Sequence, residues 1–388
     1  MTGPLWKDVA ATRLQEDDER LITRHCRTLP PDTLNFGSND YLGLASHPEV
    51  VEAARKALVQ DGLGPRSARL LAGNTALIDE LENALAKAKQ TEATLVFPCG
   101  YSASIGAIPA MIDGQATVIL DEKAHACLWD GARLSKARTR MFRHNDLQHL
   151  DDILEQERIR SKTHPVLVVV ESLYSMEGDR ADLKALVELK EKWGAWLLVD
   201  EAHAFGSLGS HGQGLIDSAQ LSEGVEIQLG TLGKAVGSMG GFVAASANTI
   251  QLLRQRARSF LFTTAPPVPA VAAALKGVRL IQSAEGAKRR QKLARLVGHC
   301  HHQAPSGVPV LSQIIPLTVY EENKVLQLSK TLGLQGIYVP AIRFPTVPLG
   351  SARLRISINA LLNESDLDRL FSALREVCPE MDGDLKPA

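Results

Sequence analysis

One lysine lies in a glycine-lined turn between two apolar runs, a setting that can make its amine reactive. Residues 230–246 read GTLGKAVGSMGGFVAAS, so Lys234 follows the run EIQL and precedes the run FVAA. Glycines let the backbone pass close to a bulky group. A lysine in a partly dry pocket loses its charge easily and attacks carbonyl carbons. For Lys234 alone a solvated loop lysine is the simpler interpretation, so the rest of the chain must decide.

Other polar residues that could do chemistry also follow apolar runs. They are Gly100 and Tyr101 after TLVF, His125 after TVILD, Ser175 after VLVVV, Asp200 and His203 after WLLV, and Thr231 with Lys234 after EIQL. In a parallel sheet the carboxyl ends of the strands meet at one edge, where ligands bind. A helix beginning near Gly100, which Ser102 could cap, would add N–H groups suited to a phosphate. The sequence therefore predicts one site at this edge.

The elements that must position these residues alternate between strand and helix. Continuous β-branched runs separated by helical stretches predict an α/β fold with a mostly parallel sheet covered on both faces. We expect Asn145 and Asp182 to cap helices and Gly194 to end one. The predicted organisation is an N-terminal helical segment (1–45), a large cofactor-binding α/β domain (46–285) and a smaller C-terminal α+β domain (286–388).

Composition and charge exclude several classes of function. The chain has 388 residues and a net charge of -1, which gives no reason to expect nucleic acid or an anionic membrane as a partner. No apolar run reaches the roughly 20 residues of a membrane span, and the charged N-terminus does not resemble a secretory signal. The five cysteines are scattered and lack a CxxC pair. They are typical of reduced thiols, so we expect a cytoplasmic protein.

A carboxylate that ends one strand and a lysine just after the next are what pyridoxal phosphate requires. The lysine can bond the cofactor's aldehyde, and the carboxylate can keep the pyridine nitrogen protonated so that the ring accepts electrons. Asp200 alone would be a strand-end turn former, and His125 alone a structural histidine. Their joint order and their strand-end placement with Lys234 favour the cofactor site.

Four motifs carry a resemblance to a known family. TLGKAVGSMGGFVA, VDEAHAFGSLGSHGQG, SNDYLGLASHPEV and AIRFPTVPLGSARLRIS resemble the α-oxoamine synthases, which are fold type I pyridoxal-phosphate enzymes. The resemblance spans about residues 34–375. It implies that Lys234 bonds the cofactor, Asp200 pairs with the pyridinium nitrogen and His125 stacks on the ring. It further implies cofactor contacts from a second set of residues, namely Ser175, His203, Thr231 and the Gly100-Tyr101 backbone.

The resemblance also implies the substrates and the assembly. Arg355 would grip the carboxylate of an amino acid as a bidentate fork, and Asn39 and Thr346 match substrate or cofactor contacts. Thr263 and Thr264 match a segment that reaches the phosphate of a neighbouring subunit, which implies a homodimer with shared active sites. The implied reaction is a decarboxylative condensation of L-alanine with an acyl-CoA.

The chain departs from the family where the acyl group would bind. The segment before LNF is short, so the arginine that contacts acyl-CoA is best matched by Arg24, with Arg20 and Arg27 as alternatives. Phe344 follows Arg343, and Leu362 stands where relatives carry histidine. We expect pimeloyl-CoA as the acyl donor, with Arg343 or an N-terminal arginine on its far carboxylate. A branch that makes signalling amino ketones, or one that uses glycine or serine, is the alternative.

Three other interpretations are weaker. The DEAH box at residues 200–203 names a helicase class, but the chain has no GxxxxGK[ST] phosphate loop. The run His299-Cys300-His301-His302 could bind a metal, but no second ligand pair has zinc spacing, so we expect no metal. A catalytically dead scaffold of the same fold would not need Lys234, Asp200 and His125 together.

Overall fold

The chain forms two compact units. The computed structural model describes residues 5–305 and 307–379. The larger unit comprises residues 39–175 and 179–294, and the smaller unit comprises the described parts of 1–38, 176–178 and 295–388. Residues before Asn39 therefore group with the carboxy-terminal part of the chain. Helix α12 (Ala284–Gln303) contains the division between the two units.

The larger unit is built on one mostly parallel sheet, as predicted. Its seven strands within the described residues lie in the order β2-β8-β7-β6-β5-β3-β4. They are β2 (Ala93–Phe97), β3 (Thr117–Asp121), β4 (Arg138–Phe142), β5 (Val166–Glu171), β6 (Trp196–Asp200), β7 (Ile227–Thr231) and β8 (Gly241–Ala245). Strand β8 runs antiparallel to both β2 and β7, because the turn that carries Lys234 reverses the chain directly after β7.

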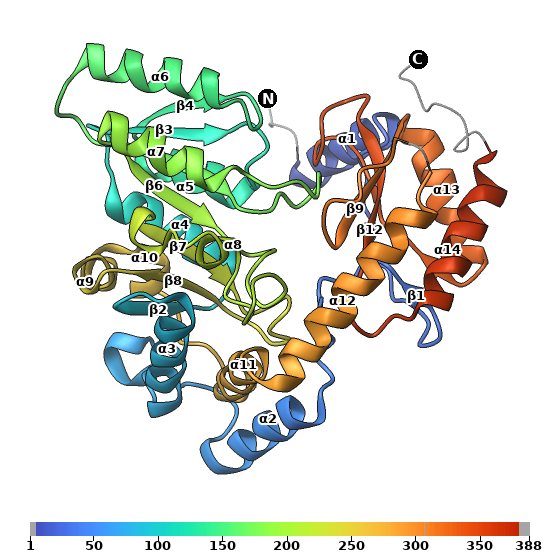
Figure 1. The fold of residues 1–388 in the computed structure, drawn as a ribbon, viewed down its shortest axis with the longest axis horizontal. Coiled ribbons are helices and arrows are strands. Elements are labelled where there is room, and N and C mark those ends of the chain that lie inside the picture. The colour runs from blue at the N-terminus through green and yellow to red at the C-terminus, as the bar shows by residue number, and fades with distance from the viewer. Residues whose placement is uncertain (1–4, 306, 380–388) are drawn as a thin grey trace. The chain divides into compact units, whose positions relative to one another are not determined.

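Helices cover both faces of this sheet, because successive side chains of its strands point to opposite sides and both sides are apolar (Figure 1). One face packs against α4 (Gly100–Met111), α5 (Ala126–Ser135), α9 (Ala247–Arg256) and α10 (Arg258–Leu261). The other packs against α6 (Leu147–Arg160), α7 (Leu183–Trp193) and α8 (Leu215–Ser218). In β5 every residue of VLVVVE is buried, which leaves only the strand ends open to a ligand.

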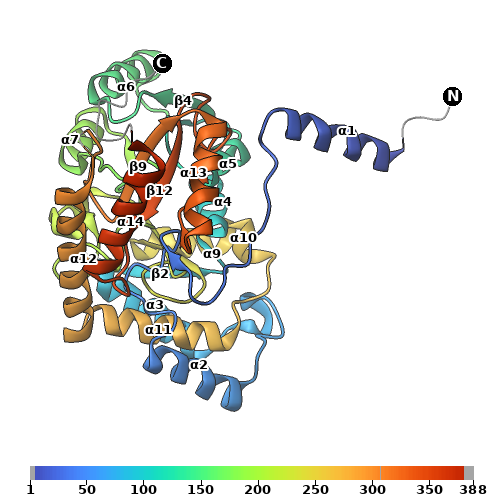
Figure 2. The same ribbon diagram turned by 90° about the vertical axis from the view of Figure 1, so that its right-hand side faces the viewer.

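A second helical layer of the larger unit lies beside β2. Helices α2 (Pro48–Asp61), α3 (Ala76–Lys89) and α11 (Val268–Ile281) lie side by side in both views (Figures 1 and 2). Pro48 occupies the first turn of α2, where its missing N–H costs nothing. A π-helical turn (η1, Arg69–Gly73) and a short 3₁₀ turn (η2, Ser222–Gly224) complete the unit.

The smaller unit combines a short antiparallel sheet with helices, the α+β pattern predicted for the end of the chain. Within its described residues, the sheet has the order β11-β12-β9, and β1 pairs with β10 in parallel. The elements are α1 (Trp6–Glu19), β1 (Leu34–Asn35), β9 (Ile314–Tyr320), α13 (Glu322–Leu334), β10 (Ile337–Tyr338), β11 (Ala341–Ile342), β12 (Ala352–Ser357) and α14 (Glu364–Val377).

Two cap predictions are confirmed and two are wrong. Asp182 caps α7, and Gly194 ends it in a left-handed conformation. The cap of α6 is Asp146, because the preceding Asn145 adopts a left-handed φ of 54° and turns away from that role. The cap of α4 is Cys99, whose sulfur accepts the N–H of Ser102 at 3.4 Å. Ser102 therefore lies inside the helix that it was expected to cap.

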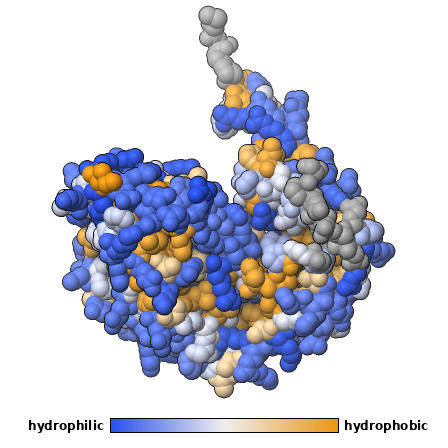
Figure 3. Space-filling view, turned by 45° about the horizontal axis from the view of Figure 1, so that its top comes forward, coloured by the Kyte–Doolittle hydropathy of each residue, from blue (hydrophilic) through white to orange (hydrophobic). Residues whose placement is uncertain are grey.

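One face of the molecule is mostly polar. On the face drawn in Figure 3, hydrophilic residues predominate and apolar residues form scattered patches. Among the residues that the structure describes, no helix is both long enough and apolar enough to cross a membrane. All five cysteines are free thiols, as the sequence predicted; Cys26 is exposed, whereas Cys127, Cys300 and Cys378 are buried.

Candidate active site

The turn that carries Lys234 is held in one conformation by its own backbone. The N–H of Leu232 donates to the carbonyl of Gly240 at 2.9 Å, and the N–H of Gly237 donates to the carbonyl of Lys234 at 2.9 Å. Gly237 has a φ of 74°, and a Cβ there would lie 2.4 Å from the backbone nitrogen of Ala45. Only glycine fits that position. The half-buried Lys234 side chain is therefore presented from a rigid support.

The Lys234 amine ends a chain of hydrogen bonds that reaches back to the N-terminal part of the larger unit. Its Nζ lies 2.7 Å from Nε2 of His203, and Nδ1 of His203 lies 2.7 Å from the hydroxyl of Tyr41. Tyr41 donates to Oδ1 of Asn39 at 3.2 Å, so its lone pairs accept the Nδ1–H of His203. Nε2 of His203 is then unprotonated and accepts from the Lys234 amine.

Two carboxylates end neighbouring strands beside this amine. Asp200 ends β6 and Glu171 ends β5, and the two residues pair in register. Asp200 is 8% exposed, and its Oδ1 accepts the N–H of Ala202 at 2.8 Å. Glu171 Oε1 accepts the backbone N–H of His125 at 2.7 Å. Glu171 was missed from the sequence, although a carboxylate at a strand end was the same signal that singled out Asp200.

His125 is held as a neutral ring with a defined proton position. It is the N-cap of α5, and its Nδ1 accepts the backbone N–H of Cys127 at 3.2 Å. Burial lowers the pKa of His125, and the nearby Lys234 ammonium lowers it further against the opposing effect of Asp200. The neutral imidazole therefore carries its proton on Nε2. Burial raises the pKa of Cys127 to about 12, so its thiol, 3.0 Å from Nδ1, stays protonated.

The first turn of α4 lies against the end of β7. A Cβ added to Gly100 would lie 3.5 Å from the Thr231 side chain, at ordinary van der Waals distance. Thr231 Oγ1 donates to the carbonyl of Gly240 and accepts the N–H of Gly233 at 3.2 Å. The first N–H groups of a helix have no partner within it, and they favour an anion. Half-exposed Tyr101 follows Gly100, and its hydroxyl bonds the Asp130 carboxylate.

These groups line one cavity of about 170 Å³. Its lining residues are Gly100, Tyr101, Ser104, His125, Cys127, Glu171, Asp200, Ala202, His203, Leu229, Gly230, Thr231 and Lys234. An amine, a buried carboxylate, a neutral imidazole and a helix N-terminus thus converge. This set fits pyridoxal phosphate, which needs an amine for its aldehyde, a carboxylate for its ring nitrogen and N–H donors for its phosphate.

Three residues predicted for the cofactor do not line this cavity. Ser175 is buried in the loop after β5. Thr263 is half-buried and Thr264 is exposed in the segment that follows α10, and neither is among the lining residues. Their roles remain predictions. Tyr41, which is fully buried, was missed because nothing in the loop sequence SNDYLGL indicates that its hydroxyl meets His203.

The smaller unit contains a second pocket, of about 460 Å³, that is rich in arginine. Arg24 and Arg27 line it, whereas Arg20 does not. Arg24 donates to the hydroxyl of Thr346 at 3.1 Å. Arg343 also lines the pocket, but its guanidinium donates to the backbone carbonyls of residues 21 and 23. Burial lowers the pKa of Arg343, and the charges of Arg24 and Arg27 lower it further.

The remaining predicted substrate residue lies inside the sheet of the smaller unit. Arg355, on β12, is 5% exposed and donates to the hydroxyl of Ser357 at 2.7 Å. Leu362 is buried, whereas Phe344 is 41% exposed. The buried guanidinium of Arg355 can donate two parallel hydrogen bonds to a carboxylate, and its predicted substrate role stays a prediction.

The run His299-Cys300-His301-His302 lies in α12. Across residues 5–305 and 307–379, no group of three or more His, Cys, Asp or Glu side chains could hold a metal ion. His299 instead bonds Asp368 at 2.7 Å, and Cys300 is fully buried within α12. The run of His and Cys is part of a helix surface and its packing.

Comparison with known proteins gives concordant matches over nearly the whole chain. The family model "Aminotransferase class I and II" matches residues 31–374. The 8-amino-7-oxononanoate synthase of Methylobacterium sp. (strain 4-46) is 42% identical over 345 residues, which cover 89% of this chain and 86% of that protein. The synthase of Granulibacter bethesdensis is 39% identical over 387 residues, covering 97% and 99% of the two chains.

A solved structure shows the same fold. A serine palmitoyltransferase from S. paucimobilis, solved with a bound PLP–myriocin aldimine, superposes with a TM-score of 0.87. It is 28% identical, and the match covers 96% of this chain and 98% of that one.

Proposed function

Because the chain belongs to the aminotransferase class I and II family and is similar to 8-amino-7-oxononanoate synthases over most of its length, we propose that it condenses L-alanine with an acyl-CoA. The cofactor is pyridoxal 5′-phosphate. Identity to the curated synthases reaches 43%, against 28% for the serine palmitoyltransferase. That difference favours alanine over serine. The observation that carries the proposal is the cavity in which Lys234, Asp200 and His125 converge.

Each of these residues has a defined role toward the cofactor. Lys234 is the amine that bonds its aldehyde carbon, and the buried Asp200 keeps its ring nitrogen protonated. The neutral His125 ring would cover one face of the cofactor ring. The first turn of α4, with Thr231, receives the phosphate. When bound, the cofactor supplies an electron sink for the pair left on the alanine Cα.

Lys234 also moves the proton of the reaction. Nζ of Lys234 would take the Cα proton of alanine and become an ammonium. The acceptor Nε2 of His203, at 2.7 Å, then stabilises that ammonium. The hydroxyl of Tyr41 fixes the tautomer of His203 that makes this possible. A neutral base that is held by a fixed acceptor needs little reorganisation when it takes a proton.

The bonds of the reaction balance without an oxidant. The alanine Cα bonds to the thioester carbon, and the carbon–sulfur bond breaks to release CoA as a thiolate, which takes a proton from solvent. The bond from Cα to the carboxylate then breaks and releases carbon dioxide. Lys234 returns its proton to Cα. The products are an amino ketone, CoA and carbon dioxide.

For the acyl group we propose pimeloyl-CoA, which would give 8-amino-7-oxononanoate. The far carboxylate of a pimeloyl chain needs a cation, and the pocket of the smaller unit offers Arg24 and Arg27. Arg343 is committed to two backbone carbonyls, so its contribution is to hold the segment that carries Arg24. Arg355 is proposed to bind the alanine carboxylate, with Asn39 and Thr346 as further substrate or cofactor contacts.

The proposal also covers the assembly of the protein and its location in the cell. We propose a homodimer in which Thr263 and Thr264 of each copy reach the phosphate site of the other, and Ser175 as a further cofactor contact. The partial exposure of Thr263 and Thr264, and their absence from the cavity of their own chain, support this arrangement. We also propose a cytoplasmic location, which the five free thiols favour.

The test is the release of free CoA across a matrix of substrates. L-Alanine, glycine and L-serine are each combined with pimeloyl-, octanoyl- and palmitoyl-CoA, with Lys234→Ala as the blank. We expect the fastest release from L-alanine with pimeloyl-CoA. Faster release from L-serine with palmitoyl-CoA would refute the proposal. Arg24→Ala should raise the KM for pimeloyl-CoA, and the matched Arg20→Ala, outside the pocket, should leave it unchanged.

A further inference from the structure

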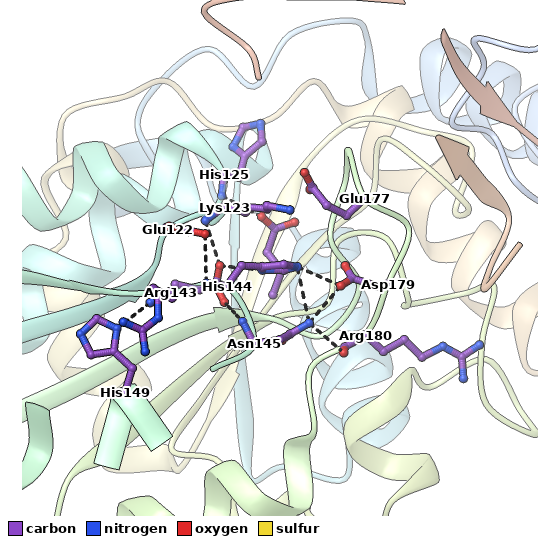
Figure 4. A network of polar contacts seen from close by, with 12 residues as sticks. Glu122, Lys123, His125, Arg143, His144, Asn145, His149, Glu177, Asp179 and Arg180 are labelled. Atoms are coloured by element: carbon purple, nitrogen blue, oxygen red, sulfur yellow. Dashed lines mark hydrogen bonds and ion pairs between the residues drawn. The ribbon is translucent and has the colours of Figure 1, made fainter. Parts of the chain in front are cut away.

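A histidine outside the cofactor cavity joins two loops at the carboxyl edge of the sheet (Figure 4). His144 follows β4, and its Nδ1 lies 2.9 Å from Oδ1 of Asp121, the last residue of β3. Its Nε2 lies 2.8 Å from Oδ2 of Asp179, in the loop after β5. The His144 side chain is 12% exposed and that of Asp121 is fully buried. Both ring nitrogens thus face carboxylates.

Because a carboxylate can only accept, both ring nitrogens of His144 must donate, and the ring is an imidazolium. Burial alone would lower the pKa of His144, but the hydrogen bonds to Asp121 and Asp179 outweigh it and raise the pKa to about 9. Two other titratable groups that face this site are Glu122, which accepts the backbone N–H of His144 at 3.1 Å, and Tyr174. The Tyr174 ring packs edge-on against the imidazole, with centroids 4.5 Å apart.

Asp121 shapes the loop that leads to His125. Its Oδ1 accepts the N–H of Lys123 at 2.8 Å, and its carbonyl accepts the N–H of Ala124 at 3.0 Å. The next residue is His125, whose own N–H is held by Glu171. Rotation of the Asp121 carboxylate would break the turn that delivers His125. The contact with His144 fixes that carboxylate.

Asp179 closes the loop that contains Ser175. Its carbonyl accepts the N–H of Tyr174 at 3.0 Å, which brings the two ends of the loop together. Its Oδ2 accepts both from His144 and from the side-chain amide of Asn145 at 3.0 Å. Asn145 can reach this carboxylate because its backbone is left-handed and its own N–H bonds Oδ2 of Asp121 at 2.9 Å. His144 and Asn145 therefore each bond both Asp121 and Asp179, and so connect the two loops.

We propose that His144 is a positioning residue of the active site: by donating from each ring nitrogen, it ties the loop that carries His125 to the loop that carries Ser175. The inference rests on the proposed function, because both residues are assigned to the cofactor there. Nothing in the reaction needs His144 to touch the cofactor or a substrate. It acts through Asp121 and Asp179, and its loss should misplace cofactor contacts without removing any.

The chain offers a matched control for this contact. His299 bonds Asp368 at 2.7 Å in the smaller unit, where the side chains are 25% and 52% exposed. His299→Gln removes a histidine–aspartate pair of similar length to which no role is assigned. His144→Gln removes the charge and one donor of the positioning contact. Asp179→Asn removes one carboxylate, keeps its shape, and serves if the first variant does not fold.

The experiment measures cofactor binding rather than turnover. Each variant is titrated with pyridoxal phosphate, and the circular dichroism of the bound cofactor band is recorded. We expect His144→Gln and Asp179→Asn to weaken binding by about tenfold or more and to diminish the band; the loss of a partner that orients a metal ligand typically costs about 10–100-fold in affinity. His299→Gln should bind like the unmodified protein.

The outcomes separate the inference from the proposed function. A protein that binds no pyridoxal phosphate before any substitution refutes the function. Normal binding and a normal band in both variants, with or without a lower melting temperature, overturn the positioning role alone. Nitrogen-15 spectra of histidine-labelled protein at pH 7.5, assigned through His144→Gln, should show protons on both ring nitrogens of His144. An unprotonated ring nitrogen would overturn the inference as well.

Discussion

The buried ion pair between Lys89 and Glu201 makes a sharp test of how the cofactor cavity is supported. Lys89 ends α3, and Glu201 follows Asp200 directly. The Lys89 amine donates to the Glu201 carboxylate and to the carbonyl of Gln213 at 2.7 Å. Both charged side chains are completely buried. The pair therefore anchors the segment that leads from Asp200 to His203 and beyond.

The burial of the Lys89–Glu201 pair determines how much Lys89→Met should lower the free energy of unfolding. Glu201 also accepts the N–H groups of Leu215 at 2.6 Å and Ile216 at 3.1 Å, so it cannot move out toward water. Removal of one partner from a buried pair costs about 3–5 kcal/mol because a buried charge is left unpaired. An exposed pair contributes about 0–1 kcal/mol. We expect Lys89→Met to lower the free energy of unfolding by about 3–5 kcal/mol.

Lys192→Met is the matched control. Lys192 pairs with Asp151 at 2.9 Å, but its side chain is 54% exposed. Its amine lies 4.8 Å from the centre of the Trp193 ring, much as that of Lys89 lies 5.9 Å from the ring of Phe205. The free energy of unfolding is measured in urea by far-ultraviolet circular dichroism.

Two results would refute the reasoning. The first is a loss from Lys89→Met no larger than that from Lys192→Met. The second concerns the double variant Lys89→Met/Glu201→Gln, in which glutamine keeps an acceptor for the two N–H groups but carries no charge. We expect it to be more stable than Lys89→Met alone. If it is less stable, the unpaired charge is not the cause of the loss.

The remaining predictions concern the chemistry and its pH dependence. Asp200→Asn should lower turnover by orders of magnitude while the cofactor still bonds Lys234, as absorption spectra can check; near-normal turnover would remove Asp200 from the mechanism. Arg355→Ala should weaken alanine binding by about 2–5 kcal/mol. If a spectral titration shows that this variant binds alanine normally, Arg355 does not bind the alanine carboxylate. Because the folded pKa of His144 is raised to about 9 from 6.5, its stabilising contribution is complete below pH 6.5 and is lost as pH rises through about 9. The stability of His144→Gln should fall less over that window than that of the unmodified protein, and equal declines would contradict this.

The fold of the larger unit could be predicted because its strands are buried on both faces. The run VLVVV has no alternation of polar and apolar residues, so it is recognisable as a strand buried on both faces. The helix that comes next, α7, has recognisable ends. The N-terminal helical segment was predicted over residues 1–45, whereas α1 ends at Glu19. The carbonyls of Leu21 and Thr23 accept from Arg343 instead of from a continued helix, and that contact is more than 300 residues away in the sequence.

The cavity could be predicted only in part, because some of its residues are marked by local sequence features and others are not. Strand ends are local features, so Asp200 and Lys234 were recognisable, and Glu171 carried the same signal. The contact from His203 to Tyr41 joins residues 162 apart, and no local pattern encodes it. The grip of His144 on Asp121 and Asp179 is equally non-local, since it depends on three strands being neighbours in the sheet.

The central claim is that Lys234 holds pyridoxal phosphate in the cavity that Asp200 and His125 share. The direct test is to add the cofactor, reduce the protein with borohydride so that any bond from a lysine amine to the aldehyde becomes permanent, and map the modified peptide by mass spectrometry. We predict a single phosphopyridoxyl group on Lys234, which L-alanine added before reduction should displace. A group on another lysine, or none at all, would contradict the account.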